Sequence, residues 1–158
     1  MWLCYNIINL DRNRRIYVVE KLSDPGLIQY IYDTVEKTAF YQLVGLQLQS
    51  IAKGEAVFTL QTDERHTNPA SLIHGGIIMA MADAAMGNAI RSLGVMGVTV
   101  DCSTAFLAAA PVGSLLEARG RVLKQGKNMI FAEAYVYSGE QLVGHCKASF
   151  FNTGPLQY

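Results

Sequence analysis

The feature that most constrains the fold is a stretch in the middle of the chain, Gly75 to Leu93, that is dense in alanine, methionine, isoleucine and leucine. Between Ile77 and Ile90, only Asp83 and Asn88 interrupt an apolar sequence. We read this stretch as a helix, and a helix that is apolar on almost every side has to be enclosed by other structure. The sequence therefore predicts a long helix in the centre of the fold.

The segments on either side of this helix carry the signals of strands joined by tight turns. Upstream, a helix is predicted over residues 27–40, followed by a hairpin with strands at 44–52 and 55–62 around a Lys53-Gly54 turn. Downstream, four strands are predicted at 98–107, 114–124, 128–138 and 141–152. In the second of these four, apolar and charged residues alternate, which indicates an antiparallel strand with one buried face. The predicted class is α+β, with an antiparallel sheet wrapped around one helix.

The length and composition of the chain fit one compact domain. The chain has 158 residues, of which 51% are hydrophobic and 16% charged, which favours a single core over two domains or a disordered segment. Residues 1–24 have mixed charge and a weak pattern, and Pro25-Gly26 then marks a boundary. We expect residues 1–24 to be a poorly ordered N-terminal appendage and residues 25–158 to form the domain.

Composition also argues against several classes of function. Thirteen basic residues balance thirteen acidic ones, so no overall basic field is present to hold nucleic acid. No run approaches the roughly 20 apolar residues that span a bilayer, so no membrane association is expected. The odd number of cysteines, without a CxxC pair, favours a reducing, cytoplasmic location. The histidines, His66, His74 and His145, lack the spacing of a zinc site, so no metal is predicted.

Two adjacent glycines, Gly75 and Gly76, mark the predicted start of the central helix. Glycine costs about 1 kcal/mol relative to alanine inside a helix, which favours placing the pair at the end. The backbone N–H groups there are unpaired, and Gly75 has no side chain to obstruct an approaching oxygen. Such an amide can stabilise the negative charge that forms on a carbonyl oxygen during acyl transfer. The pair can equally serve only to pack the helix closely against the sheet.

Asp83 is the second candidate, because it lies in a segment too apolar to solvate a carboxylate. It is either a satisfied structural carboxylate or a base or nucleophile at an enclosed interface. Eight residues of helix, roughly 12 Å of rise, separate it from Gly75, whereas both groups need to lie about 3 Å from one reacting carbonyl. If both are catalytic, Asp83 of one subunit must face Gly75 of another, which predicts two equivalent sites in a two-fold dimer.

The motif as a whole resembles that of the hotdog-fold acyl-CoA thioesterases of the phenylacetyl-CoA (PaaI-like) type. That family has an asparagine, a His-Gly-Gly six residues later, and an acidic residue nine positions after the histidine; here these are Asn68, His74-Gly75-Gly76 and Asp83. The resemblance covers about residues 38–152 and includes the order hairpin, helix, four strands. It implies a hotdog fold, in which an antiparallel sheet wraps around a long central helix.

The resemblance also implies a role for each matching residue. Gly75 polarises the thioester carbonyl, Asn68 supports that carbonyl or orients water, and Asp83 of the neighbouring chain activates water or attacks the carbonyl. His74 caps and positions the helix. Thr99 matches a position where related enzymes carry a serine or threonine that holds the attacking water, although an ordinary strand residue is an equally good interpretation.

The coenzyme A contacts are assigned through the same resemblance. Gly76 and the turn Lys124-Gln125-Gly126-Lys127 are the predicted binding residues, because in similar proteins this turn lies near the nucleotide and phosphates of coenzyme A. A solvated hairpin turn is the competing interpretation of the same four residues. Met79, Met81, Met86 and Phe106 are expected to line the pocket for the acyl group.

The predicted function is hydrolysis of a small aryl- or medium-chain acyl-CoA to the free acid and coenzyme A. The coenzyme A thioester is the substrate, so no cofactor is expected, and the predicted assembly is a homodimer or a homotetramer built as a dimer of dimers, with its active sites at subunit interfaces. The sequence leaves open whether Asp83 is a general base or a nucleophile. Two alternatives also stay open, namely a non-catalytic acyl-CoA sensor and an acyl-thioester hydratase or dehydratase.

Overall fold

The computed structural model describes residues 8–10, 16–18, 22 and 24–158. The first two of these segments are short strands, β1 (Ile8–Leu10) and β2 (Ile16–Val18), which pair antiparallel in a small sheet of their own. Apart from Leu22 and Asp24, the rest of the expected N-terminal appendage, and with it the expected lack of order there, lies outside the described residues. Among the helices that are described, none is both long and apolar enough to cross a bilayer.

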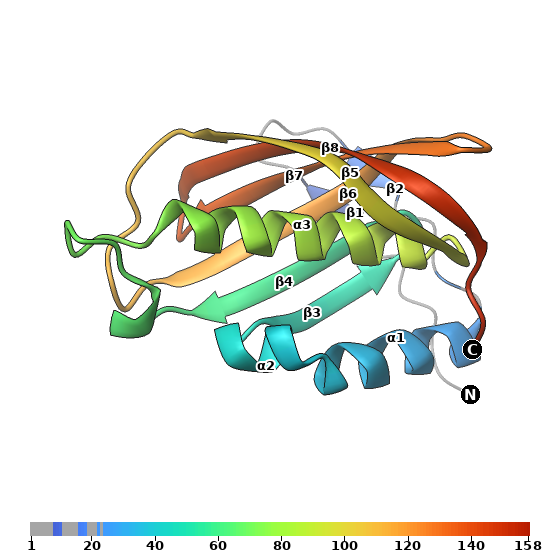
Figure 1. Cartoon of the computed structure of the whole chain (residues 1–158), viewed down its shortest axis with the longest axis horizontal. Coiled ribbons are helices and arrows are strands. Elements are labelled where there is room, and N and C mark those ends of the chain that lie inside the picture. Colours follow the sequence, from blue (N-terminus) through green and yellow to red (C-terminus); the bar gives the residue numbers. More distant parts are fainter. Residues whose placement is uncertain (1–7, 11–15, 19–21, 23) are drawn as a thin grey trace.

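Six further strands form one antiparallel sheet, in the order β3-β4-β6-β7-β8-β5. The helix α3 lies across this sheet, which curves around it, and α1 and α2 lie beside β3 (Figure 1). This is the predicted architecture, a hotdog fold of class α+β. The elements in chain order are α1 (Pro25–Lys37), α2 (Ala39–Val44), β3 (Gln47–Ala52), β4 (Glu55–Gln61), a 3-10 turn (Glu64–His66), α3 (Gly75–Arg91), β5 (Val95–Phe106), β6 (Leu115–Gln125), β7 (Met129–Ser138) and β8 (Gln141–Pro155).

The first helical region differs from the predicted single helix at 27–40. The helix α1 begins earlier, because the side chain of Asp24 accepts hydrogen bonds from the N–H groups of its first turn and Pro25 follows that cap directly. It ends at Thr38, whose backbone is extended, and the chain then forms the second helix α2. Val44 was predicted to start a strand, but it closes α2, and the strand begins only after Gly45 turns the chain with a φ of 87°.

Glycines at the sheet surface let α3 lie very close to the strands. A Cβ at Gly120 on β6 would lie 2.4 Å from the carbonyl carbon of Ala85, and one at Gly144 on β8 would lie 2.5 Å from Cγ2 of Ile78. Real carbon atoms do not approach so closely, so both positions require glycine at this helix-to-sheet distance. The backbone of β6 therefore fixes how deep the helix sits in the curved sheet.

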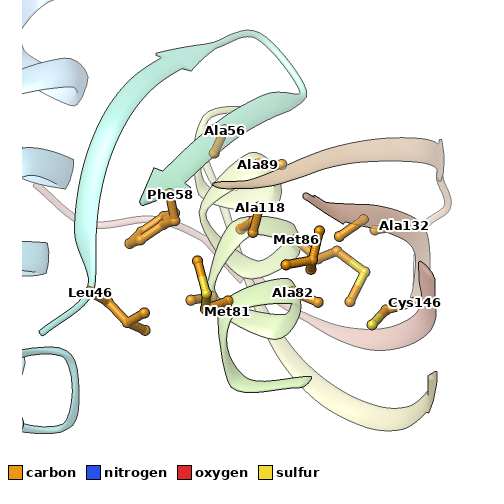
Figure 2. Close-up of a cluster of buried hydrophobic side chains, with 14 of the residues drawn as sticks. Leu46, Ala56, Phe58, Met81, Ala82, Met86, Ala89, Ala118, Ala132 and Cys146 are labelled. Atoms are coloured by element: carbon orange, nitrogen blue, oxygen red, sulfur yellow. The ribbon is translucent and has the colours of Figure 1, made fainter. Parts of the chain in front are cut away.

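Larger side chains fill the remaining space around α3. Phe58 from β4 and Met81 and Met86 from α3 are each fully buried, with small alanines between them (Figure 2). Asn88, which interrupts the apolar sequence, is buried too, and its amide donates to the Ala84 carbonyl and accepts from Arg91. The buried polar group is thus satisfied, as a close-packed core requires.

We expect Gly120→Ala to lower the free energy of unfolding by about 1 to 3 kcal/mol, because the new methyl group would meet the backbone of α3 rather than a side chain that could move. Equilibrium denaturation in urea measures this change. Lys124→Ala, at an exposed position of the same strand, is the control and should alter stability by less than about 0.5 kcal/mol. Equal stability of the two variants would show that the helix does not approach the sheet so closely.

Candidate active site

The N-terminus of α3 presents a free backbone amide. His74 is the N-cap residue, and its Nδ1 accepts a hydrogen bond of 2.8 Å from the Gly76 N–H. Within the described part of the chain, no group accepts from the Gly75 N–H. Gly75 therefore keeps a donor at the positive end of a 17-residue helix, which is the arrangement that stabilises an anionic oxygen.

A buried histidine holds the loop that carries this cap. The Nδ1 atom of His66 accepts from the Asp63 N–H, and its Nε2 lies 2.8 Å from the Val44 carbonyl oxygen at the end of α2. Because the carbonyl can only accept, Nε2 is the donor in this contact. The backbone carbonyl of His66 in turn accepts from the His74 N–H at 2.8 Å. His66 thus positions the cap and is not a metal ligand.

Asn68 shapes the same loop with its side chain. Its Oδ1 accepts hydrogen bonds from the Ala70 and Leu72 N–H groups, at 2.9 and 3.2 Å. This turn uses the carbonyl half of the amide and leaves the NH₂ half as a donor. Asn68 and Gly75 both border one cavity, so the structure brings these two predicted residues together.

The cavity beside Gly75 has a volume of about 410 Å³. Its floor is formed by Ile73 and Ile78, which are buried, and its wall by Phe106 and the segment that follows β5. Of the four residues expected to line a pocket, only Phe106 does so, because Met81 and Met86 face the core and Met79 is not in the lining. The full lining is Asn68, Leu72, Ile73, Gly75, Ile78, Phe106, Leu107, Ala108 and Ala109.

Asp83 lies on a different part of α3, outside the cavity lining of its own chain. It sits near the middle of the helix on the side next to β5, where Thr99 Oγ1 donates to Asp83 Oδ1 at 2.9 Å. This hydrogen bond fits both interpretations of Thr99, as a structural partner of the carboxylate and as part of a site for water. Gly75 and Asp83 of one chain are therefore both accessible but are not parts of one site within that chain.

The turn Lys124-Gln125-Gly126-Lys127 is also far from Gly75 of the same chain. The backbone carbonyl of Asn128, just after the turn, accepts a hydrogen bond from the Asn152 N–H. The strand β8 then continues to Pro155, which pairs with Val95 at the start of β5, the strand that follows α3. The turn thus lies towards the C-terminal end of α3, whereas Gly75 begins it (Figure 1). The structure does not bring these predicted coenzyme A contacts to the cavity of their own chain.

Cys102, Cys146 and the remaining histidine lie outside this constellation. Burial raises the pKa of the Cys102 and Cys146 thiols, which disfavours either as a nucleophile. His145 hydrogen-bonds Glu133 at 3.1 Å on the outer face of the sheet, where Arg121 also pairs with Glu133. Burial acts to raise the pKa of Glu133, but the hydrogen bonds from Arg121 and His145 outweigh it, and the pKa falls below its ordinary value. Across the described residues, no group of three or more potential metal ligands occurs.

Comparison with known proteins places this geometry among thioesterases. Residues 70–145 match the thioesterase superfamily family model. A putative esterase of Pseudomonas aeruginosa is 37% identical over 102 residues, which span 63% of this chain and 76% of that protein. The acyl-coenzyme A thioesterase PaaI of Escherichia coli is 32% identical over 92 residues, which span 58% and 66% of the two chains. A solved structure of the E. coli PaaI protein superposes with a TM-score of 0.77 at 24% identity, covering 83% of this chain and 96% of that one.

The residues that line the cavity after β5 were missed in the sequence. The segment 107–109 follows a strand and precedes a predicted turn, and nothing in its small apolar residues marks it as part of a site. Leu72 and Ile73 belong to the predicted loop but were not distinguished from the rest of it. Residues 107–109 become neighbours of Gly75 only in the folded chain, which periodicity does not reveal.

Replacing His74 tests whether it acts through its capping hydrogen bond. His74→Ala removes the acceptor for the Gly76 N–H and should lower the free energy of unfolding by about 0.5 to 2 kcal/mol. His74→Asn supplies another good capping side chain and should stay within about 0.5 kcal/mol of the unaltered protein. Thermal and urea unfolding measure both variants. An equal loss of unfolding free energy in His74→Ala and His74→Asn would show that the cap does not stabilise α3.

Proposed function

The chain belongs to the thioesterase superfamily, and we propose that it hydrolyses an acyl-CoA thioester to the free acid and coenzyme A. The observation that carries this proposal is the unpaired Gly75 N–H at the N-terminus of α3, which opens on an apolar cavity. An amide in that position can bind the carbonyl oxygen as it gains negative charge. The similarity to an acyl-coenzyme A thioesterase supports coenzyme A as the carrier of the acyl group.

The second half of the site is supplied, in this proposal, by a neighbouring subunit. Asp83 lies on a strip of α3 that the rest of the chain leaves open, together with Gly76, Ala80 and Gly87. A Cβ at Gly87 would meet nothing within 4 Å. Small residues on such a strip allow another helix to approach closely, and a two-fold axis about midway between Gly75 and Asp83 would set each Asp83 beside the Gly75 end of the antiparallel partner helix.

The free edge of the sheet supports the same assembly. The strand β5 is the last of the six and has twelve residues, with Val98 and Val100 more than half exposed in the single chain. Long apolar edge strands tend to pair with other strands. The opposite edge, β3, has α1 beside it (Figure 1). Pairing of two β5 strands would extend the sheet across a dimer and bring the two open strips of α3 together.

The reaction can then proceed with backbone and carboxylate groups alone. Asp83 of the partner takes a proton from a water molecule held with Thr99, the water oxygen bonds to the thioester carbon, and the carbonyl electron pair moves to the oxygen held by Gly75. When the carbonyl re-forms, the C–S bond breaks and the thiolate takes the proton from Asp83. In the alternative route, Asp83 attacks the carbon directly, expels the thiolate and forms an anhydride, which water then hydrolyses.

The coenzyme A half of the bound substrate must extend out of the cavity, because no residue that lines the cavity is a cation. The turn Lys124-Gln125-Gly126-Lys127 lies towards the far end of α3 in its own chain, so we assign its contact with the phosphates to the site of a neighbouring subunit. Lysine side chains can bind phosphate as point charges. Asn68 keeps its proposed place beside the carbonyl, through its free amide NH₂. Gly76 keeps its proposed place as a substrate contact next to Gly75.

Replacing Asp83 with asparagine should lower kcat for thiol release by about 10² to 10⁴-fold, because the amide cannot accept the proton or form an anhydride. The assay follows free thiol across a panel of acyl-CoA substrates. Asp101→Asn is the matched control, since it makes the same change on an exposed residue of β5, and its kcat should be unchanged.

Two results would contradict the proposal. Unaltered turnover by the Asp83→Asn variant would exclude this carboxylate from the chemistry. Binding of acyl-CoA by the unaltered protein, without release of thiol from any member of the panel, would instead identify a sensor. In both measurements light scattering should show the same assembly for Asp83→Asn and the unaltered protein, so that a loss of assembly is not mistaken for a loss of chemistry.

A further inference from the structure

The cavity beside Gly75 has the character of an acyl-binding site rather than a coenzyme A site. None of its lining residues is charged, and Asn68 contributes the one polar side chain of that lining. The diphosphate of coenzyme A requires cationic or dipolar partners, whereas a hydrocarbon group is stabilised by apolar walls. The aliphatic side chains of Ile73, Ile78 and Leu107 therefore suit the acyl half of a thioester whose carbonyl lies at Gly75.

One side chain of the cavity lining lies directly beside Gly75. A Cβ added to Gly75 would be 2.9 Å from Cε1 of Phe106 and 3.0 Å from its Cζ, and the three nearest heavy atoms at this position all belong to the Phe106 ring. A carbonyl oxygen held by the Gly75 N–H places its first acyl carbon within reach of the same ring. Any substituent on that carbon must therefore share space with Phe106.

We propose that Phe106 determines specificity by excluding acyl groups branched at the carbon next to the thioester carbonyl. This inference rests on the hydrolytic function proposed above and adds a substrate class to it. An unbranched CH₂ or a flat aryl carbon passes beside the ring, while a second substituent collides with the ring atoms. The cavity behind the ring, about 410 Å³, then accepts the remainder of an aryl or straight-chain acyl group.

The test compares two isomeric substrates, butyryl-CoA and isobutyryl-CoA, which differ only in branching at this carbon. The unaltered protein should prefer butyryl-CoA by at least about tenfold in kcat/KM, the discrimination that a tight apolar pocket provides. Phe106→Ala should reduce the preference to less than about threefold, mainly by raising kcat/KM for isobutyryl-CoA. The side chain is 53% exposed, so its removal should leave the core intact.

A matched control variant shortens another apolar side chain that lines the same cavity. Leu107 also lines the cavity and is about as exposed as Phe106, but none of its atoms is among those nearest to Gly75. Leu107→Ala should keep the preference of the unaltered protein within about twofold. If circular dichroism shows that Phe106→Ala is unfolded, Phe106→Leu replaces it and should give an intermediate preference.

The outcomes separate this inference from the proposed function. An active protein that hydrolyses the two isomers equally well overturns the role of Phe106 and leaves the hydrolytic function standing. A preference for butyryl-CoA that persists in the Phe106 variants likewise overturns the role of Phe106 and leaves the hydrolytic function standing. If the unaltered protein releases thiol from no acyl-CoA at all, the proposed function fails and this inference fails with it.

Discussion

The site depends on how deeply α3 sits in the sheet. Gly120 and Gly144 bring the strands against the backbone and side chains of the helix, and the sheet then curves around it. Because that packing covers most sides of the helix, the groups proposed to meet a substrate lie at its N-terminus and on one open strip. The Gly75 amide is at the first of these places and Asp83 is on the second. The core packing thus decides which groups of α3 meet a substrate.

Under the proposed mechanism, the same geometry makes a single chain an incomplete enzyme. About 12 Å of helix rise separates the proposed oxyanion donor from the proposed base, and Asp83 does not border the cavity that Gly75 borders. The turn Lys124-Gln125-Gly126-Lys127, the proposed coenzyme A contact, also lies away from Gly75, towards the C-terminal end of α3. Each of these separations is removed if two copies pack with their α3 helices antiparallel. One two-fold axis would therefore complete the carbonyl site, the base and the phosphate contact together.

The sequence predicts most of the architecture but only part of the site. The central helix and the succession of strands along the chain follow from residues 75–93 and from turns such as Lys53-Gly54, because apolar pattern and turn chemistry are local properties. The break at Thr38 and the helical place of Val44 were not predicted, since tertiary packing overrides weak local preference there. The cavity wall after β5 was not predicted either, because only the curved sheet brings those residues to Gly75. His66 is absent from the predicted site because its hydrogen bonds to Val44 and His74 form only in the folded chain.

The central claim, that one active site contains groups from two chains, is tested most directly by complementation. Gly75→Pro removes the N–H at the first position of α3, where the helix backbone accepts proline although the new ring must displace Phe106, and Asp83→Asn removes the base. Each variant alone should be inactive. After dissociation and random reassembly of equal amounts, half of the dimers are mixed and each mixed dimer has one intact site, so about a quarter of the original activity should return. No recovery, with mixed dimers demonstrated by mass spectrometry, would contradict a shared site.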